Sequence, residues 1–179
     1  VRQCLYGQKF WKDEFDFKSR MCWLPDVFGF PATLPQVLKK SGMDYFMTIK
    51  LTSNDFNRFP YRTFNWKGLD GTTVLSHMEP LGDYNAGNSP LAIKKSEDRY
   101  SEKEICDKAL LIYGDGDGGG GPGEGHLEYM KRHSKNIDGL APCKTYPAVN
   151  FFDDIKDMTD VLPTHNGELY YERHQGCYT

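Results

Sequence analysis

Short apolar runs alternate with segments of helical periodicity along most of this chain, and this alternation limits the possible folds more than any other feature. The strand-like runs are residues 21–24, 44–49, 63–66, 72–77, 109–113 and 144–149. The helical pattern marks residues 1–15, 34–40 and 127–133, and a polar stretch over 85–103 runs into a further helix. Strands and helices that alternate at this spacing predict an α/β fold with a mainly parallel sheet.

The ends of the predicted strands carry the first candidates for function. Residues 68–71 (Gly-Leu-Asp-Gly) lie between the runs 63–66 and 72–77, which predicts two strands connected across a turn. In a mainly parallel sheet, functional residues lie at the carboxyl ends of the strands. Asp26 and Asp117 both follow strand-like runs, so we expect them on one rim of the sheet.

The composition argues against several classes of protein. With 39% hydrophobic and 14% aromatic residues, the chain can build a core and is expected to be ordered. The net charge is −3 without a basic block or stripe, which disfavours nucleic acids and anionic membranes as partners. No apolar run has the length needed to cross a bilayer. The five cysteines lack a C-x-x-C pair, which disfavours a disulfide framework and a Cys-rich zinc site and favours reduced, cytosolic-type chemistry.

Asp26 lies in the run Trp23–Phe30 (WLPDVFGF), where proline, glycine and three aromatic residues surround the acid. Aromatic faces suit the apolar sides of sugar rings, and a carboxylate among them can attack an anomeric carbon. Burying such a charge costs free energy unless a cation or hydrogen-bond donors offset it. The alternative is a structural aspartate that caps the start of a helix.

A glycine-rich loop follows the run 109–113, and four interpretations of it compete. Gly-x-Gly-x-x-Gly matches the dinucleotide fingerprint, but Asp115 and Asp117 would repel a pyrophosphate, which disfavours an NAD-dependent oxidoreductase. A P-loop is excluded because no Gly-Lys-Ser/Thr follows, and an EF-hand loop would need Tyr113 as its first ligand. The fourth interpretation is a carboxylic acid on a loop whose glycines allow close approach to a ligand. Two carboxylates on one rim form the general pattern of glycoside hydrolysis.

These two segments resemble motifs of glycoside hydrolase family 38, in its cytosolic, vacuolar and bacterial branch. Trp23–Phe30 is similar to the W-L-P-D-x-F-G-[YF] motif, whose Asp is both nucleophile and zinc ligand, which implies these roles for Asp26. The loop is similar to the G-x-G-D-G-G-G-G-P motif, whose Asp is the acid/base, which implies this role for Asp117. Further matches in family order are residues 1–3, 34–38, 42–46, 68–71 and 167–170, so the resemblance covers essentially the whole chain.

The resemblance implies a class II α-mannosidase, which is a retaining, exo-acting, Zn2+-dependent enzyme that removes terminal mannose from mannose-containing oligosaccharides. It implies that the sheet is part of a barrel-like (β/α)7 catalytic domain. Trp23, Phe28, Lys50 and Tyr84 are the implied substrate contacts, each of which has a structural alternative. The family's other zinc ligands are a His-x-Asp pair on the first strand and a later His. None of the five histidines here stands in either context.

We therefore expect residues 1–179 to be a partial α-mannosidase catalytic domain, inactive by itself. The start at Val1, without an initiator Met or a signal-peptide pattern, is consistent with an internal piece. Departures from the branch pattern are Ser53, Gly123 and Cys177, where an aromatic residue, Thr and Thr are usual. We expect the full-length protein to be a cytoplasmic homo-oligomer, with the vacuole or lysosome as alternative locations. The rival function is a carbohydrate-binding pseudoenzyme without turnover.

Overall fold

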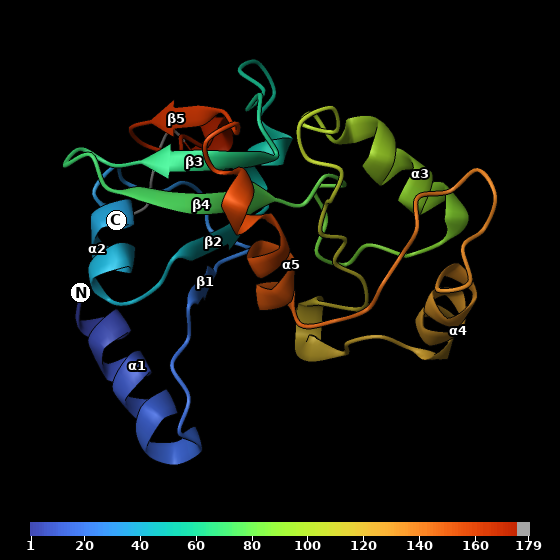
Figure 1. Ribbon diagram of the computed structural model, residues 1–179, viewed down its shortest axis with the longest axis horizontal. Helices are drawn as coiled ribbons and strands as arrows, with labels where there is room; N and C mark the ends of the chain where they lie inside the picture. The colour runs from blue at the N-terminus through green and yellow to red at the C-terminus, as the bar shows by residue number, and fades with distance from the viewer. Residues whose placement is uncertain (175–179) are drawn as a thin grey trace.

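The computed structural model describes residues 1–174 as five strands and five α-helices (Figure 1). The strands are β1 (Met21–Trp23), β2 (Tyr45–Thr48), β3 (Thr63–Lys67), β4 (Thr73–Met78) and β5 (Thr164–Asn166). The helices are α1 (Arg2–Phe15), α2 (Leu34–Lys40), α3 (Pro90–Arg99), α4 (Glu124–His133) and α5 (Ala148–Ile155). Short 3-10 turns are η1 (Lys50–Ser53), η2 (Asp117–Gly119), η3 (Lys156–Met158) and η4 (Glu172–His174). Cys177 and the side chain of His174 lie outside the described part.

The strands form one sheet in the order β1-β2-β4-β3-β5. Three of its four pairings are parallel, namely β1·β2, β2·β4 and β3·β5, which confirms the predicted mainly parallel α/β fold. The exception is the antiparallel pair β3·β4, which is connected by the predicted turn at residues 68–71. The Gly68 amide donates to the carbonyl of Thr72 at 2.9 Å and so closes this hairpin. The described residues form an open sheet, with β1 and β5 at its ends.

The core lies on both faces of the sheet, because all four residues of β2 are buried and alternate between the faces. Phe46 packs into a cluster that includes Leu38 of α2, together with Phe64 and Trp66 of β3. Tyr45 and Met47 belong to the second cluster, to which α5 contributes Phe151, Phe152 and Ile155. The helices α2 and α5 therefore cover opposite faces of β2.

Two predicted strands are wrong. Residues 109–113 are irregular, although Leu110 and Ile112 pack against the second core cluster. The Leu110 amide donates to the ring Nε2 of His77 at 3.3 Å rather than to a neighbouring strand. A partly buried apolar run alone does not make a strand when no sheet edge lies within hydrogen-bonding reach.

The second error concerns residues 144–149, which end in the first turn of α5 instead of forming a strand. Pro147 occupies the N-cap position with φ −56°, and it has no amide hydrogen for a strand ladder. The apolar residues after it recur at helical spacing and bury Phe151 and Ile155. The short polar strand β5 (Thr-His-Asn) was not predicted, because it lacks an apolar pattern.

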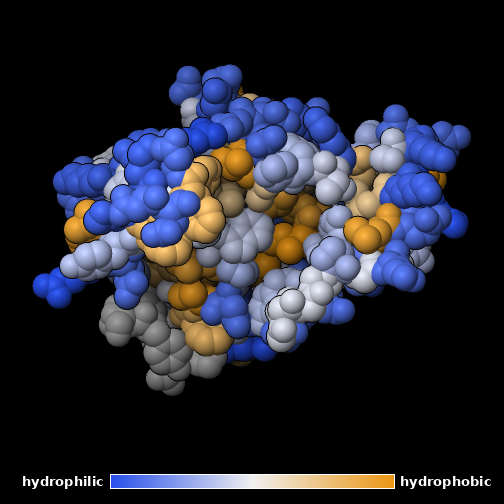
Figure 2. All heavy atoms as spheres, turned by 90° about the horizontal axis from the view of Figure 1, so that it is seen from below, coloured by the Kyte–Doolittle hydropathy of each residue, from blue (hydrophilic) through white to orange (hydrophobic). Residues whose placement is uncertain are grey.

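The helix α1 extends away from the sheet and has no buried residue (Figure 1). Gln8 connects it to the body of the protein by donating to the carbonyls of Ser19 at 2.6 Å and Ser41 at 3.1 Å. In the view of Figure 2, hydrophobic side chains line a hollow in the middle of the face, whereas the rim is mainly hydrophilic. Within residues 1–174, no helix combines the length and the apolar character that a membrane span requires.

Candidate active site

Three neighbouring parallel strands deliver Asp26, Lys50 and Tyr84 to one edge of the sheet, whereas Asp117 lies on η2, after residues that form no strand, so the expectation that it follows a strand is wrong. Asp26 comes three residues after the end of β1, and Lys50 lies on η1, directly beyond β2. Tyr84 and Asn85 lie in the loop that follows β4. Because the strand order is β1-β2-β4 and both pairings are parallel, the three carboxyl ends meet at one rim.

Asp26 is half exposed and has two partners. The Lys50 Nζ lies 2.8 Å from its Oδ1, and the side chain of Asp26 is 50% exposed. The Tyr84 hydroxyl donates to its Oδ2 at 3.4 Å. Partial burial acts to lower the pKa of Lys50, but its bonds to Asp26 and Tyr84 outweigh burial and raise it. The Asp26 carboxylate is therefore held by the Lys50 ammonium group and the Tyr84 hydroxyl.

Aromatic rings surround Asp26 and Lys50. The Lys50 Nζ lies 5.5 Å from the centroid of the Phe28 ring and 4.9 Å from that of Tyr84, both within cation–π range. Phe28 in turn stacks on Tyr171, with ring centroids 5.8 Å apart. Trp23 is 38% exposed. The four residues predicted to contact substrate thus lie around Asp26.

The glycine loop that carries Asp117 is closed on itself. Asp115 and Gly121 exchange backbone hydrogen bonds of 2.8 and 2.7 Å. Gly114 makes this closure possible: its φ is +109°, and a Cβ there would lie 2.8 Å from the carbonyl carbon of Gly121. Glycine here allows two parts of the loop backbone to approach each other, and the predicted approach of backbone to a ligand stays a prediction.

Asn85, which the sequence analysis missed, fixes the orientation of Asp117. Its Nδ2 donates to the Oδ2 of Asp117 at 3.0 Å. Its Oδ1 accepts from the amides of Gly116 at 2.6 Å and Asp117 at 2.9 Å. One amide side chain therefore binds the carboxylate and the backbone that carries it. The available signal was a polar residue beside Tyr84 in a loop that follows a strand.

Asp26 and Asp117 line the same pocket, which has a volume of about 380 Å³. This volume falls in the range of about 300–1,000 Å³ that is usual for small-molecule sites. Its lining residues are Trp23, Pro25, Asp26, Tyr84, Ile112, Tyr113, Gly114, Asp115, Gly116, Asp117 and Gly121. Lys50 and Phe28 are not part of the lining. The structure thus brings three carboxylates, those of Asp26, Asp115 and Asp117, and three aromatic rings into one pocket.

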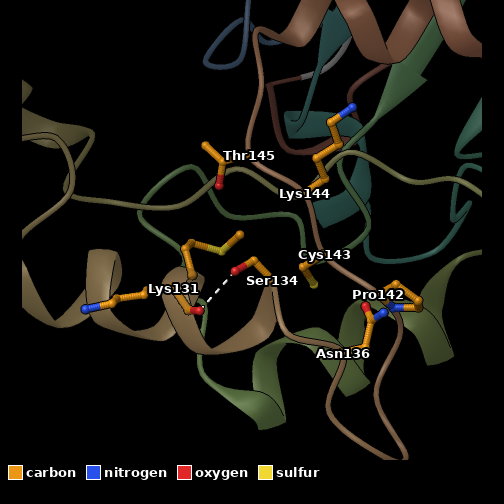
Figure 3. A pocket seen from close by; sticks show the side chains of 8 residues that line it. Lys131, Ser134, Asn136, Pro142, Cys143, Lys144 and Thr145 are labelled. Carbon is orange, nitrogen blue, oxygen red and sulfur yellow. Dashed lines mark hydrogen bonds between the residues drawn. The ribbon is translucent and has the colours of Figure 1, made fainter.

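A larger pocket, of about 630 Å³, lies between α4 and the segment 142–145 (Figure 3). Its lining residues are Met130, Lys131, Ser134, Asn136, Pro142, Cys143, Lys144 and Thr145, without a carboxylate or a histidine. Burial raises the pKa of the Cys143 thiol, so this cysteine is not an activated nucleophile. Of these two pockets, the smaller one is lined by carboxylates and the larger one is not.

The described residues do not by themselves make a zinc site. Within residues 1–174, no group of three or more His, Cys, Asp or Glu side chains could hold a metal ion. Asp26 is the one predicted ligand, and Lys50 contacts one of its oxygens. The rings of His77 and His133 are buried, with hydrogen-bond partners elsewhere in the fold, at Thr63 and Leu110 and at Asn88. Zn2+ remains a prediction.

A pair of carboxylates that line one pocket is the general pattern of glycoside hydrolysis. Comparison with known proteins identifies the family. Residues 1–168 match the family described as Glycosyl hydrolases family 38 N-terminal domain, and the chain belongs to it. The resemblance noted in the sequence is confirmed.

The relatives are α-mannosidases. Over its whole length the chain is 40% identical to "Alpha-mannosidase" of Saccharomyces cerevisiae, 39% to human "Alpha-mannosidase 2C1" and 38% to "Alpha-mannosidase G" of Dictyostelium discoideum. It spans only 17%, 17% and 16% of these proteins. The crystal structure of an α-mannosidase from Enterococcus faecalis V583 superposes with a TM-score of 0.74 at 15% identity, over 96% of this chain and 20% of that one. This likeness shows a shared fold.

Proposed function

We propose that this chain is part of the catalytic domain of a retaining, exo-acting α-mannosidase, with Asp26 as nucleophile and Asp117 as acid/base. The observation that carries the proposal is that both carboxylates line one pocket although they are far apart in the sequence. Family membership and three α-mannosidase relatives support the choice of mannose as the sugar. The substrate class is a mannose-containing oligosaccharide.

The reaction has two displacement steps. Asp26 attacks the anomeric carbon and forms an ester bond to the mannosyl group, while Asp117 donates its proton to the departing glycosidic oxygen. Asp117 then removes a proton from the water that cleaves this ester. Retaining enzymes hold such carboxyl groups about 5–5.5 Å apart, and we expect this separation in the complete enzyme.

The surrounding residues orient these two carboxylates. Asn85 donates a hydrogen bond to one carboxylate oxygen of Asp117, so the other oxygen of Asp117 can face the pocket. Lys50 contacts one carboxylate oxygen of Asp26, and the Tyr84 hydroxyl donates to the other. Trp23 lines the pocket and supplies an aromatic face for the sugar ring. Phe28 lies under Lys50, which limits the positions of the cation.

A longer protein would complete this site. The chain corresponds to about a sixth of its relatives, so we propose that residues outside 1–179 complete the (β/α)7 barrel and supply further Zn2+ ligands beside Asp26. Zinc, when bound, would supply Lewis-acid chemistry at the sugar hydroxyls. The cytoplasmic location and the homo-oligomeric state also remain predictions.

The test compares Asp26→Asn with Asp115→Asn in the full-length protein. Both side chains belong to the same pocket, but only Asp26 is proposed to react. We expect Asp26→Asn to lower kcat for a 4-nitrophenyl α-mannoside by about 10⁴-fold or more, with the circular dichroism spectrum unchanged. A 2-deoxy-2-fluoromannosyl reagent should label Asp26, as peptide mass spectrometry would show.

Asp115→Asn is the matched control and should retain most of the activity. Asp26→Asn activity within tenfold of the wild type would contradict the assignment. Mannoside binding by the wild type without any turnover would instead identify a carbohydrate-binding protein.

A further inference from the structure

Glu79 is a fully buried carboxylate that the reaction itself does not use. It follows β4 directly and has 0% exposure. Its Oε2 accepts hydrogen bonds from the amides of Gly82 at 2.7 Å and Asp83 at 3.4 Å. A buried carboxylate costs free energy. The burial of Glu79 therefore needs an explanation, and we look for it in the turn that Glu79 binds, residues 80–83.

This turn is held by other contacts as well. The Arg99 guanidinium donates to the carbonyl of Leu81 at 2.9 Å. Gly82 has φ +78° and packs so closely on η1 that a Cβ there would lie 2.5 Å from the Oγ1 of Thr52. Because η1 also carries Lys50, the turn is packed against the element that holds the cation of the site.

The two residues that follow the turn are the partners of the two carboxylates. Tyr84 donates to Asp26, and Asn85 donates to Asp117. We propose that Glu79 is a positioning residue, which fixes the turn 80–83 and through it places Tyr84 and Asn85 against both carboxylates. This inference rests on the proposed function, since it assigns Glu79 a role in that same site.

The environment of Glu79 makes its hold on the turn dependent on pH. Burial raises the pKa of Glu79 to about 7, opposed by the amides of the turn and by the charge of Arg62. The neighbouring charged groups are Arg62, which is mostly buried, Glu102 and Arg99, which interact with Arg62, and Asp83 on the turn itself. An ionised carboxylate is the stronger hydrogen-bond acceptor. The turn is therefore held more firmly above this pKa than below it.

Ionisation of Glu79 should hold the turn 80–83 more firmly but lower the stability of the folded protein. The folded pKa of Glu79 lies above its ordinary value of 4.5, so the folded protein favours the protonated form. Its contribution to stability is then present below about pH 4.5 and is lost as the pH rises through about 7. Glu79→Gln removes the buried charge, so above this pKa it should not lower the melting temperature. A residue with a merely structural role would lose activity and stability together.

The experiment uses the full-length protein as wild type, Glu79→Gln and Glu102→Gln. Glu102 is also buried, at 4% exposure, but it accepts from the amides of Arg62 and Thr63 and does not contact the turn. For 4-nitrophenyl α-mannoside hydrolysis, we expect wild-type kcat to rise through an inflection near pH 7. Glu79→Gln should lack this inflection and lose about tenfold in kcat above it, as for one weakened charge-assisted hydrogen bond. Glu102→Gln should keep the inflection.

Hydrogen exchange of the peptide over residues 80–86 provides a readout that needs no turnover. Above the Glu79 pKa we expect faster exchange in Glu79→Gln than in the wild type, with an equal or higher melting temperature. Persistence of the inflection in Glu79→Gln, or a melting temperature that falls in parallel with kcat, would overturn the inference. If the wild type shows no turnover, the proposed function fails, and unchanged exchange over 80–86 would separately refute the role of Glu79.

Discussion

Gly116→Ala tests whether the glycine loop and the loop after β4 must fit closely together. Gly116 has φ −82° and ψ −45°, a conformation that alanine adopts without backbone strain. However, an added Cβ would lie 3.0 Å from both the Cδ2 and the carbonyl oxygen of Tyr84, and 3.1 Å from the Oδ1 of Asn85. The methyl group therefore pushes against the partners of both carboxylates.

The size of the effect follows from these contacts. The added methyl group overpacks this spot, and such overpacking costs about 1–3 kcal/mol. The hydrogen bond from the Gly116 amide to Asn85 would also lengthen from 2.6 Å, which adds about 0.5–1.5 kcal/mol. The two costs sum to about 1.5–4.5 kcal/mol, and since about 1.4 kcal/mol corresponds to tenfold in rate, kcat should fall by roughly 10- to 1,000-fold. The loop is exposed and can relax outward, so the free energy of unfolding should fall by only about 1 kcal/mol.

The assay is hydrolysis of a 4-nitrophenyl α-mannoside by the full-length protein, with urea unfolding measured in parallel. Gly118→Ala is the matched control, because its φ of +75° imposes backbone strain while a Cβ there meets no atom within 4 Å. It should affect stability by about 1 kcal/mol and leave Tyr84 and Asn85 in place. The reasoning would be refuted by Gly116→Ala activity within about threefold of wild type, or by an equal loss in Gly118→Ala.

Two further predictions concern Asp117 and Asp153. Asp117→Ala should slow natural disaccharides more than nitrophenyl mannosides, because a good leaving group needs little protonation; equal losses would indicate a structural role. Arg20 and Tyr45 bind Asp153, at 2.8 Å and 2.7 Å from its Oδ1, and the hydrogen bond from Arg20 is the main reason why its pKa falls from 3.8 to about 2. Its stabilisation is therefore present above about pH 4 and lost as the pH falls through about 2. Asp153→Asn should cost about 1 kcal/mol at neutral pH, after allowance for solvent screening. A difference in unfolding free energy that does not change with pH would show that the charge is not responsible.

The sequence predicted the parts of the fold that depend on local patterns. The strands β1 to β4 and the helices over 1–15, 34–40 and 127–133 are present because their apolar residues follow the period of the element that they form. The run 109–113 has a strand pattern too, but a strand also needs a partner edge, and its position relative to His77 is a property of the tertiary structure. At 144–149 the apolar pattern ran across Pro147, where the chain changes to a helix.

The sequence also predicted some residues of the candidate site and missed others. Asp26 and Asp117 were predicted from their own surroundings in the sequence, and the structure places both in one pocket. Asn85 was missed because an asparagine in a polar loop is common, and its partners lie more than 30 residues further along the chain. Glu79 was missed because its burial depends on how the loop after β4 packs onto η1 and Arg99.

Tyr84, one of the two partners of Asp26, and Asn85, which binds Asp117, are consecutive residues, and this affects how the site moves. One peptide bond connects Tyr84 to Asn85, so their Cα atoms stay about 3.8 Å apart whatever the surrounding loops do. A thermal displacement of the glycine loop that carries Asp117 also displaces Asn85, and the same displacement reaches Tyr84 and Asp26. We therefore expect the motions of the two carboxylates to be correlated. Their separation should fluctuate less than the position of either one relative to the sheet.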